Sequence, residues 1–301
     1  MLSQIKEGKA KQVKEDNFRM SGYIESINNS IVKINKSDVS NILNLTLINY
    51  EEYLNFFVSI QEKKANDGQA IDSKINTLNS LNMHSTFLID GFLKNVIINS
   101  YSSTKIILRS IIELYIKYKF ILQSDTFVAK VYSDFSKVTL MKQNYDLDLS
   151  VETKKLLDQA YEVVNKIYNL NGKFNDDMWI KISLDHVTKK TNNKKSLQAI
   201  VEYLEEKKCI QKWTYKSYKI NCDFNHIGAN SLDELQYIDL KIEEGKFKEA
   251  YYVMLASLNY IIWDIYKSYV EFYKINDVNI KPFKLRMDQI MEGYENAEKN
   301  N

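Results

Sequence analysis

The stretch from residue 104 to 123, TKIILRSIIELYIKYKFILQ, limits the possible folds more than any other part of the chain. Twelve of the 17 residues from Ile106 to Leu122 are hydrophobic. Four of its five charged residues recur every four positions and would form one narrow stripe on a helix: Lys105, Arg109, Glu113 and Lys117. The remaining sides of such a helix need apolar partners. The pattern therefore predicts a central helix inside a helical bundle.

Turn-forming residues are scarce, with 8 glycines and one proline among 301 residues. Sheet-rich folds need many tight turns, which draw on both residue types. Helical periodicity recurs along the chain, and we find no alternating strand pattern of useful length. The sequence predicts an all-α fold, a single multi-helix bundle. We expect a helical N-terminal extension over residues 1–68, the core over 69–280 and a charged helical tail over 281–301.

Local signals predict where several helices begin and end. Asp125 and Ser150 are expected to cap the starts of two helices, and Asn171-Gly172 to end the second. A first long helix is expected from Asp38, and a last one over about 247–275. The apolar stripe expected on the first helix consists of Ile42, Leu45, Ile48, Leu54, Phe57 and Ile60.

Charge and motifs exclude several function classes. The net charge is +2, which creates no global field for nucleic acid or membranes. No signal peptide or spanning segment is found, and Cys209 and Cys222 are the only cysteines, so we expect a cytoplasmic protein. No glycine-rich phosphate loop is present, and the three histidines lack metal-ligand spacing. We therefore expect no cofactor and no metal site.

The first candidate site is the Arg109–Glu113 pair on the predicted central helix. One turn separates the two residues, so a guanidinium and a carboxylate are expected to pair there. A purely structural ion pair is one interpretation. The other is an arginine that binds phosphate or stabilises a developing negative charge, with Glu113 orienting it.

The second candidate is His226, within CDFNHIGAN at residues 222–230. It can be a hydrogen-bonded core histidine, a general acid and base, or a phosphate contact beside Asn225. On a helix, Cys222 would lie on the same side as His226, so a Cys–His dyad is a further alternative.

The third candidate is a basic, aromatic segment. Ten lysines and four acidic residues lie between Lys181 and Lys219. Lysines bind phosphates and aromatic rings stack on unpaired bases, so the end of this segment can bind single-stranded RNA. A solvated charged face with inward aromatic rings is the alternative. The RNA-binding candidates are Lys207, Lys208, Lys212, Trp213, Tyr215, Lys216, Tyr218 and, further on, Asn225.

Taken in order, these motifs resemble an uncharacterised bacterial family of all-helical proteins, one of the domains of unknown function. The matching features are Arg-x3-Glu at residues 109–113, Trp179 with Ser183, YKSY at 215–218 and Asp-aromatic-x-His at 223–226. The resemblance covers about residues 75–275.

That family is similar to the wider HEPN group of helical ribonucleases and nucleotide-binding modules, many of them linked to phage defence and toxin systems. The similarity implies a metal-independent ribonuclease that works as a homodimer or with a protein of the same system. HEPN nucleases carry an arginine a few residues before the histidine, where this chain has Ile220 and Asn221. Arg109 would then act from another helix, in a polar cleft with Glu113 and His226. The alternative is a non-catalytic scaffold, sensor or antitoxin-like protein with a structural polar core.

Overall fold

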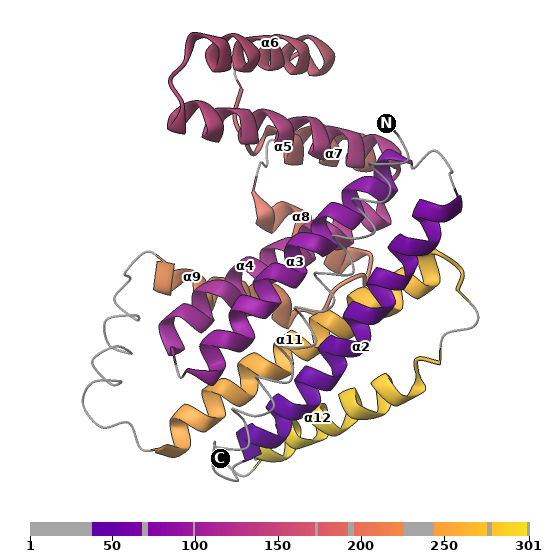
Figure 1. The fold of residues 1–301 in the computed structure, drawn as a ribbon, viewed down its shortest axis with the longest axis vertical. Helices are drawn as coiled ribbons and strands as arrows, with labels where there is room; N and C mark the ends of the chain where they lie inside the picture. Colours follow the sequence, from indigo (N-terminus) through magenta and orange to yellow (C-terminus); the bar gives the residue numbers. More distant parts are fainter. Residues whose placement is uncertain are drawn as a thin grey trace. The chain divides into compact units, whose positions relative to one another are not determined.

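The computed structural model describes residues 38–67, 72–98, 100–171, 174–191, 196–225, 244–275 and 279–299. All regular secondary structure in this part of the chain is helical, and it contains no strand, as predicted (Figure 1). The helices are α2 (Asp38–Asp67), α3 (Ser73–Ile97), α4 (Tyr101–Gln123), α5 (Thr126–Leu147), α6 (Val151–Tyr168), α7 (Met178–Thr188), α8 (Leu197–Glu206), α9 (Trp213–Asn225), α11 (Glu244–Phe272) and α12 (Lys281–Lys299).

The chain forms two compact units that share two helices. The first unit contains α2, α11 and α12 with residues 90–108, the end of α3 and the start of α4. The second contains the start of α3, the rest of α4 from Arg109, and α5 to α9. Each unit joins segments that are far apart in the sequence. The predicted division at residues 68 and 280 stays a prediction.

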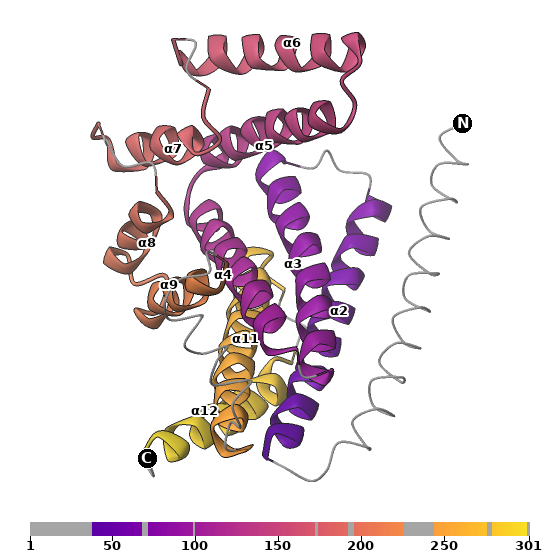
Figure 2. The same cartoon turned by 90° about the vertical axis from the view of Figure 1, so that its left-hand side faces the viewer.

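In the first unit α2 packs against α11 and α12, and the latter two pack together (Figures 1 and 2). Aromatic rings from α2 and α11 meet in this core, with the Phe56 and Tyr266 centroids 4.6 Å apart and edge to face. The expected α2 stripe needs correction at two positions. Ile48 is exposed and Leu45 only half-buried, because the buried side runs through Leu43 and Leu47.

Buried polar side chains connect the three helices of the first unit. Asn49 on α2 donates its amide to Asn259 Oδ1 on α11 over 2.9 Å. Asn259 donates in turn to Thr46 Oγ1 at 2.6 Å. From α12, Arg286 donates Nε to Asn49 Oδ1 at 2.6 Å and pairs with Glu52. Because each of these groups has a hydrogen-bond or ion-pair partner, its burial does not carry the desolvation cost of an unpaired polar atom.

The charged segment predicted at the C-terminus also has an apolar side. Pro282 stands in the first turn of α12, where its missing N–H removes no intrahelical bond. Phe283, Met287 and Ile290 follow at helical spacing and are buried. The spacing is visible in the sequence, although the surrounding charges obscured it.

In the second unit α5 and α6 form an antiparallel hairpin, and α5 also packs against α7 (Figure 1). Both predicted N-caps are confirmed. Asp125 accepts from the amides of Phe127 and Val128, and Ser150 accepts from that of Thr153. Helix α6 ends earlier than predicted, at Tyr168, and is followed by the cap residue Asn169, which adopts the left-handed conformation with φ 56°.

Candidate functional site

Arg109 is held by side chains from two helices of the second unit. Its Nε donates to Cys222 Sγ over 3.1 Å, and its Nη2 donates to the Tyr218 hydroxyl over 3.0 Å, both on α9. On its own helix, Nη2 lies 3.6 Å from Glu113 Oε2. The guanidinium is therefore fixed in orientation by contacts from α4 and α9.

Glu113 lies between two cations on α4. Lys117 donates to Glu113 Oε1 over 2.7 Å, so this carboxylate faces Arg109 on one side and Lys117 on the other. The side chains of Arg109 and Glu113 are 21% and 28% exposed, so the pair is reachable from solvent. Asp177, just before α7, lies close enough to Glu113 and Lys117 for their charges to shift its pKa.

Asp177 is a neighbour that the sequence did not indicate. Burial raises its pKa, Lys117 lowers it, and the negative charges of Asp176 and Glu113 raise it further; the pKa ends above its usual value. Asp177 lies more than 50 residues after the end of α4 in the sequence, so no local pattern indicates that it is close to Glu113 and Lys117 in space. The side chains around Arg109 therefore include two carboxylates, Glu113 and Asp177, and a second cation, Lys117, in addition to the side chains of α9.

Tyr218 keeps its proton under all ordinary conditions. Burial raises its pKa, Glu113 raises it and Arg109 lowers it, with a net value of about 12. The Arg109 guanidinium carbon also lies 5.1 Å from the centre of the Tyr218 ring. Tyr218 is thus a neutral hydrogen-bond and ring partner for Arg109, and is no general base near neutral pH.

Helix α9 places aromatic and basic side chains beside Arg109. The rings of Tyr215 and Tyr218 are stacked, with centroids 5.9 Å apart and planes at 15°. Lys219 Nζ lies 5.6 Å from the centre of the Tyr215 ring. The tyrosines and Trp213 are half-buried, whereas the lysines at 207, 208, 212, 216 and 219 are exposed. The aromatic rings therefore remain partly accessible, between the core and the solvent.

The structure brings together some of the predicted site residues. Arg109, Glu113 and Tyr218 are in contact, and Cys222 contacts Arg109. His226 lies outside the described residues, and so does the side chain of Asn225, the last residue of α9. The predicted proximity of His226 to Arg109 and Cys222 therefore stays a prediction.

Ser183, together with Trp179, forms one of the motifs on which the family resemblance rests. It lies on α7, one turn after Trp179, and is completely buried. Its hydroxyl has no hydrogen-bond partner among the residues that the structure describes. Trp179 packs against Phe120 of α4 and Tyr132 of α5, so this side of α7 contributes to the core.

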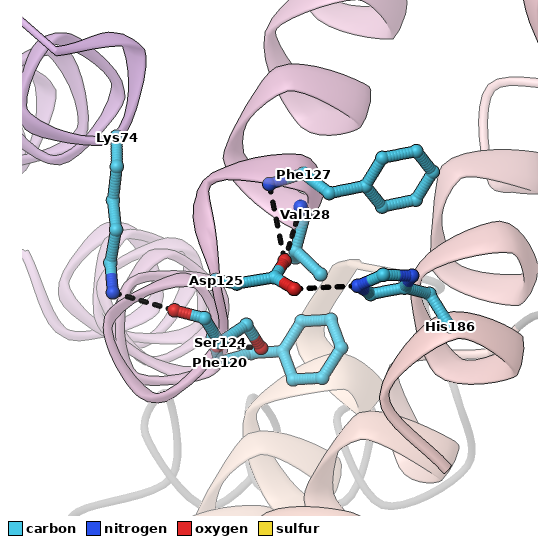
Figure 3. A network of polar contacts seen from close by, with 7 residues as sticks. All are labelled: Lys74, Phe120, Ser124, Asp125, Phe127, Val128 and His186. Carbon is cyan, nitrogen blue, oxygen red and sulfur yellow. Dashed lines mark hydrogen bonds and ion pairs between the residues drawn. The ribbon is translucent and has the colours of Figure 1, made fainter. Parts of the chain in front are cut away.

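A second polar network joins α3, α4, α5 and α7 (Figure 3). His186 Nε2 lies 2.6 Å from Asp125 Oδ2, while the other carboxylate oxygen caps α5. The His186 ring lies 4.4 Å from that of Phe127, centre to centre. Lys74 donates to the carbonyls of Leu122 and Ser124, which end α4. The network fixes the corner between α4 and α5. Asp125 was predicted as a cap, but its contact with His186 was not.

Replacing Asp125 by alanine should lower the free energy of unfolding by about 1–2 kcal/mol, mainly because the cap is lost. Burial raises the pKa of Asp125, but the hydrogen bond and charge of His186 and the two amides lower it more, so the net pKa lies below its usual value. Because the folded-state pKa is the lower one, ionised Asp125 stabilises the fold above about pH 4, and that contribution disappears as pH falls through the folded pKa.

Urea unfolding at pH 7 and pH 3 measures both effects. Asp125→Asn retains an acceptor for the cap but lacks the charge, so it should be more stable than Asp125→Ala at pH 7. The difference between wild type and Asp125→Asn should shrink at pH 3. A difference that stays constant between the two pH values would show that the Asp125 charge contributes nothing.

One family comparison coincides with this part of the chain. Residues 98–247 match DUF5677, a family of unknown function. The matched segment contains α4 to α9 and therefore Arg109, Glu113, Tyr218 and Cys222, and it extends past His226. This agrees with the expectation of a domain family of unknown function. No curated protein and no solved structure was found to match the chain.

No described helix is long and apolar enough to cross a membrane. Within the described ranges, no group of three or more His, Cys, Asp or Glu side chains could hold a metal ion.

Proposed function

We propose that the protein is HEPN-like, binds RNA along α9 and at Arg109, and cleaves it without a metal ion. The main support is the environment of Arg109. A guanidinium oriented by Cys222, Tyr218 and Glu113 lies beside a stacked pair of tyrosines. Fixed guanidinium groups suit phosphate, and partly exposed aromatic rings suit unpaired bases. A role in a bacterial defence or stress system is part of this proposal.

Each part of the arrangement has a proposed task. Arg109 binds the phosphate, and Glu113 and Tyr218 hold it in place. Tyr215 and Trp213 stack on bases, and Asn225 contacts the strand near His226. The exposed lysines at 207, 208, 212 and 216 guide the negatively charged strand toward Arg109. Such a surface recognises single-stranded RNA with little sequence preference.

Cleavage requires a proton donor or acceptor in addition to the phosphate ligand. His226 follows α9 directly in the sequence, and histidine titrates near neutral pH. In the proposed reaction the ribose 2′-oxygen attacks the adjacent phosphate while the bond between phosphorus and the 5′-oxygen breaks. His226 takes the proton of the 2′-hydroxyl and passes it to the leaving 5′-oxygen, so the products are a 2′,3′-cyclic phosphate end and a 5′-hydroxyl end. Arg109 stabilises the negative charge that develops on the phosphate oxygens.

Charge reversal on α9 tests the binding surface. Lys212→Glu with Lys216→Glu should weaken the binding of a fluorescent single-stranded RNA by roughly tenfold or more at low salt, because two phosphate partners become repulsive. The magnitude of the slope of log affinity against log salt should fall by about 1.4, because each phosphate contact to a single strand contributes about 0.7. Fluorescence anisotropy over a salt series measures both quantities.

The matched control reverses Lys137 and Lys142, two exposed lysines of α5, with the same change in net charge. It should change RNA affinity much less than the α9 pair. Equal losses in the two double variants would mean that only net charge matters, and the proposed surface on α9 would be wrong.

One observation favours the second candidate function, a non-catalytic scaffold, sensor or antitoxin-like protein. The Arg109 guanidinium already has partners on its own helix and on α9, as expected for a polar core that fixes two helices. Such a protein would need Arg109 for stability but would show no RNA cleavage. Comparing stability and activity in the same variants separates the two.

A further inference from the structure

Helix α6 has an exposed apolar stripe. Leu156, Val163 and Ile167 are 58%, 55% and 53% exposed. Successive residues of an α-helix are rotated by about 100°, so these three side chains point within about 40° of one another. They also span about three turns along the axis. Together they form an apolar stripe along one side of a helix whose other exposed residues are mostly charged.

The hairpin partner of α6 covers only the adjacent stripe. Leu157 and Val164 are buried, and Tyr168 donates its hydroxyl to Asp134 of α5. Each buried residue directly follows an exposed one, so the apolar surface of α6 is about twice as wide as the part that α5 covers. A surface helix normally exposes its polar side. A contiguous apolar stripe in that place indicates an interaction surface.

Charges beside the stripe have an order that suits pairing with an identical helix. The residues along its solvent side are Glu152, Lys155, Gln159, Glu162 and Lys166. Gln159 is the midpoint: Glu152 lies seven residues before it and Lys166 seven after. Lys155 and Glu162 lie four before and three after. Each acid thus has a base at nearly the same distance on the other side of the midpoint.

We propose that α6 pairs with α6 of a second copy of this chain, antiparallel and about a two-fold axis at Gln159. In that pairing Glu152 meets Lys166 of the partner subunit, and Leu156 lies within one residue's rise of the partner subunit's Val163. A parallel pairing would place Glu152 opposite an identical carboxylate. The charge order therefore selects both the second copy and the direction.

A membrane surface is a poorer partner than a second copy of the chain for the apolar stripe of α6. Helix α6 carries three basic residues (Lys154, Lys155, Lys166) and three acidic ones (Glu152, Asp158, Glu162). Interfacial helices that bind anionic lipid have a basic polar side, which α6 lacks. The proposal rests on these exposures and charges alone and is independent of RNA binding at Arg109.

Sedimentation velocity of the full-length chain over a concentration series tests the pairing. Wild type should dimerise in a concentration-dependent way, and Val163→Glu should raise the dissociation constant at least tenfold, because it places a charge at the centre of the stripe. The control Leu285→Glu alters an equally exposed leucine on α12. It should leave the dissociation constant unchanged.

A charge exchange tests the antiparallel order. Lys166→Glu should weaken the dimer by opposing Glu152 of the partner subunit to a second carboxylate, and adding Glu152→Lys should restore it. A wild type that stays monomeric, a dimer insensitive to Val163→Glu, or a double variant as weak as the single one would each overturn the proposal. Loss of phosphatidylcholine vesicle binding by Val163→Glu, with no dimer in wild type, would assign the stripe to a lipid surface instead.

Discussion

Replacing Asn259 by alanine should lower the free energy of unfolding by about 3 kcal/mol, one of the largest effects of any single substitution in the first unit. Asn259 is completely buried and bonds Asn49 through its oxygen and Thr46 through its nitrogen. The alanine variant would leave the Asn49 amide, also fully buried, without its acceptor. An unpaired buried polar group retains its full desolvation cost.

Urea unfolding followed by circular dichroism measures the effect. The control Asn144→Ala changes an exposed asparagine near the end of α5 and should alter stability by less than about 0.5 kcal/mol. A double-mutant cycle with Asn49→Ala should give a coupling free energy of about 1 kcal/mol or more, because the two side chains share one bond. Additive losses would contradict a direct Asn49–Asn259 interaction.

Neither asparagine was predicted as a structural residue, and the reason is distance along the chain. Asn49 and Asn259 are separated by 210 residues, so no local pattern connects them. The sequence predicted the apolar periodicity of α2 but assigned Ile48 to the buried side. Periodicity gives the direction of an apolar stripe, but the width of the buried side depends on where α11 and α12 pack.

The candidate site shows the same limit. The Arg109–Glu113 pair was predictable because residues four apart lie on one side of a helix. Tyr218 was a predicted RNA contact, and its bond to Arg109, 109 residues away in sequence, was not. The caps at Asp125 and Ser150 were predictable because a side chain bonds amides two or three residues further on. Asp177 and His186 depend on how α7 packs, which no local pattern gives.

Replacing Arg109 by alanine should reduce metal-free RNA cleavage by about 10²–10³-fold, because the reaction would lose its fixed positive charge. His226→Ala should abolish cleavage to a similar extent through loss of proton transfer. Arg109→Lys retains the charge but cannot reproduce the planar contacts with Cys222, Tyr218 and Glu113. It should therefore recover only part of the activity. The assay is a time course on total RNA in the presence of a chelator.

Stability measurements on the same variants decide between the two candidate functions. Truncation of Arg109 leaves Glu113 paired with Lys117, so the carboxylate retains a partner and the loss should stay at about 2 kcal/mol. Tyr218→Phe removes one bond to Arg109 and should cost about 1 kcal/mol. Folded variants that lose cleavage would place Arg109 and His226 in an active site. If wild type cleaves no RNA and Arg109→Ala unfolds well below the wild-type temperature, the cluster is a structural core, and the protein is a scaffold, sensor or antitoxin-like protein.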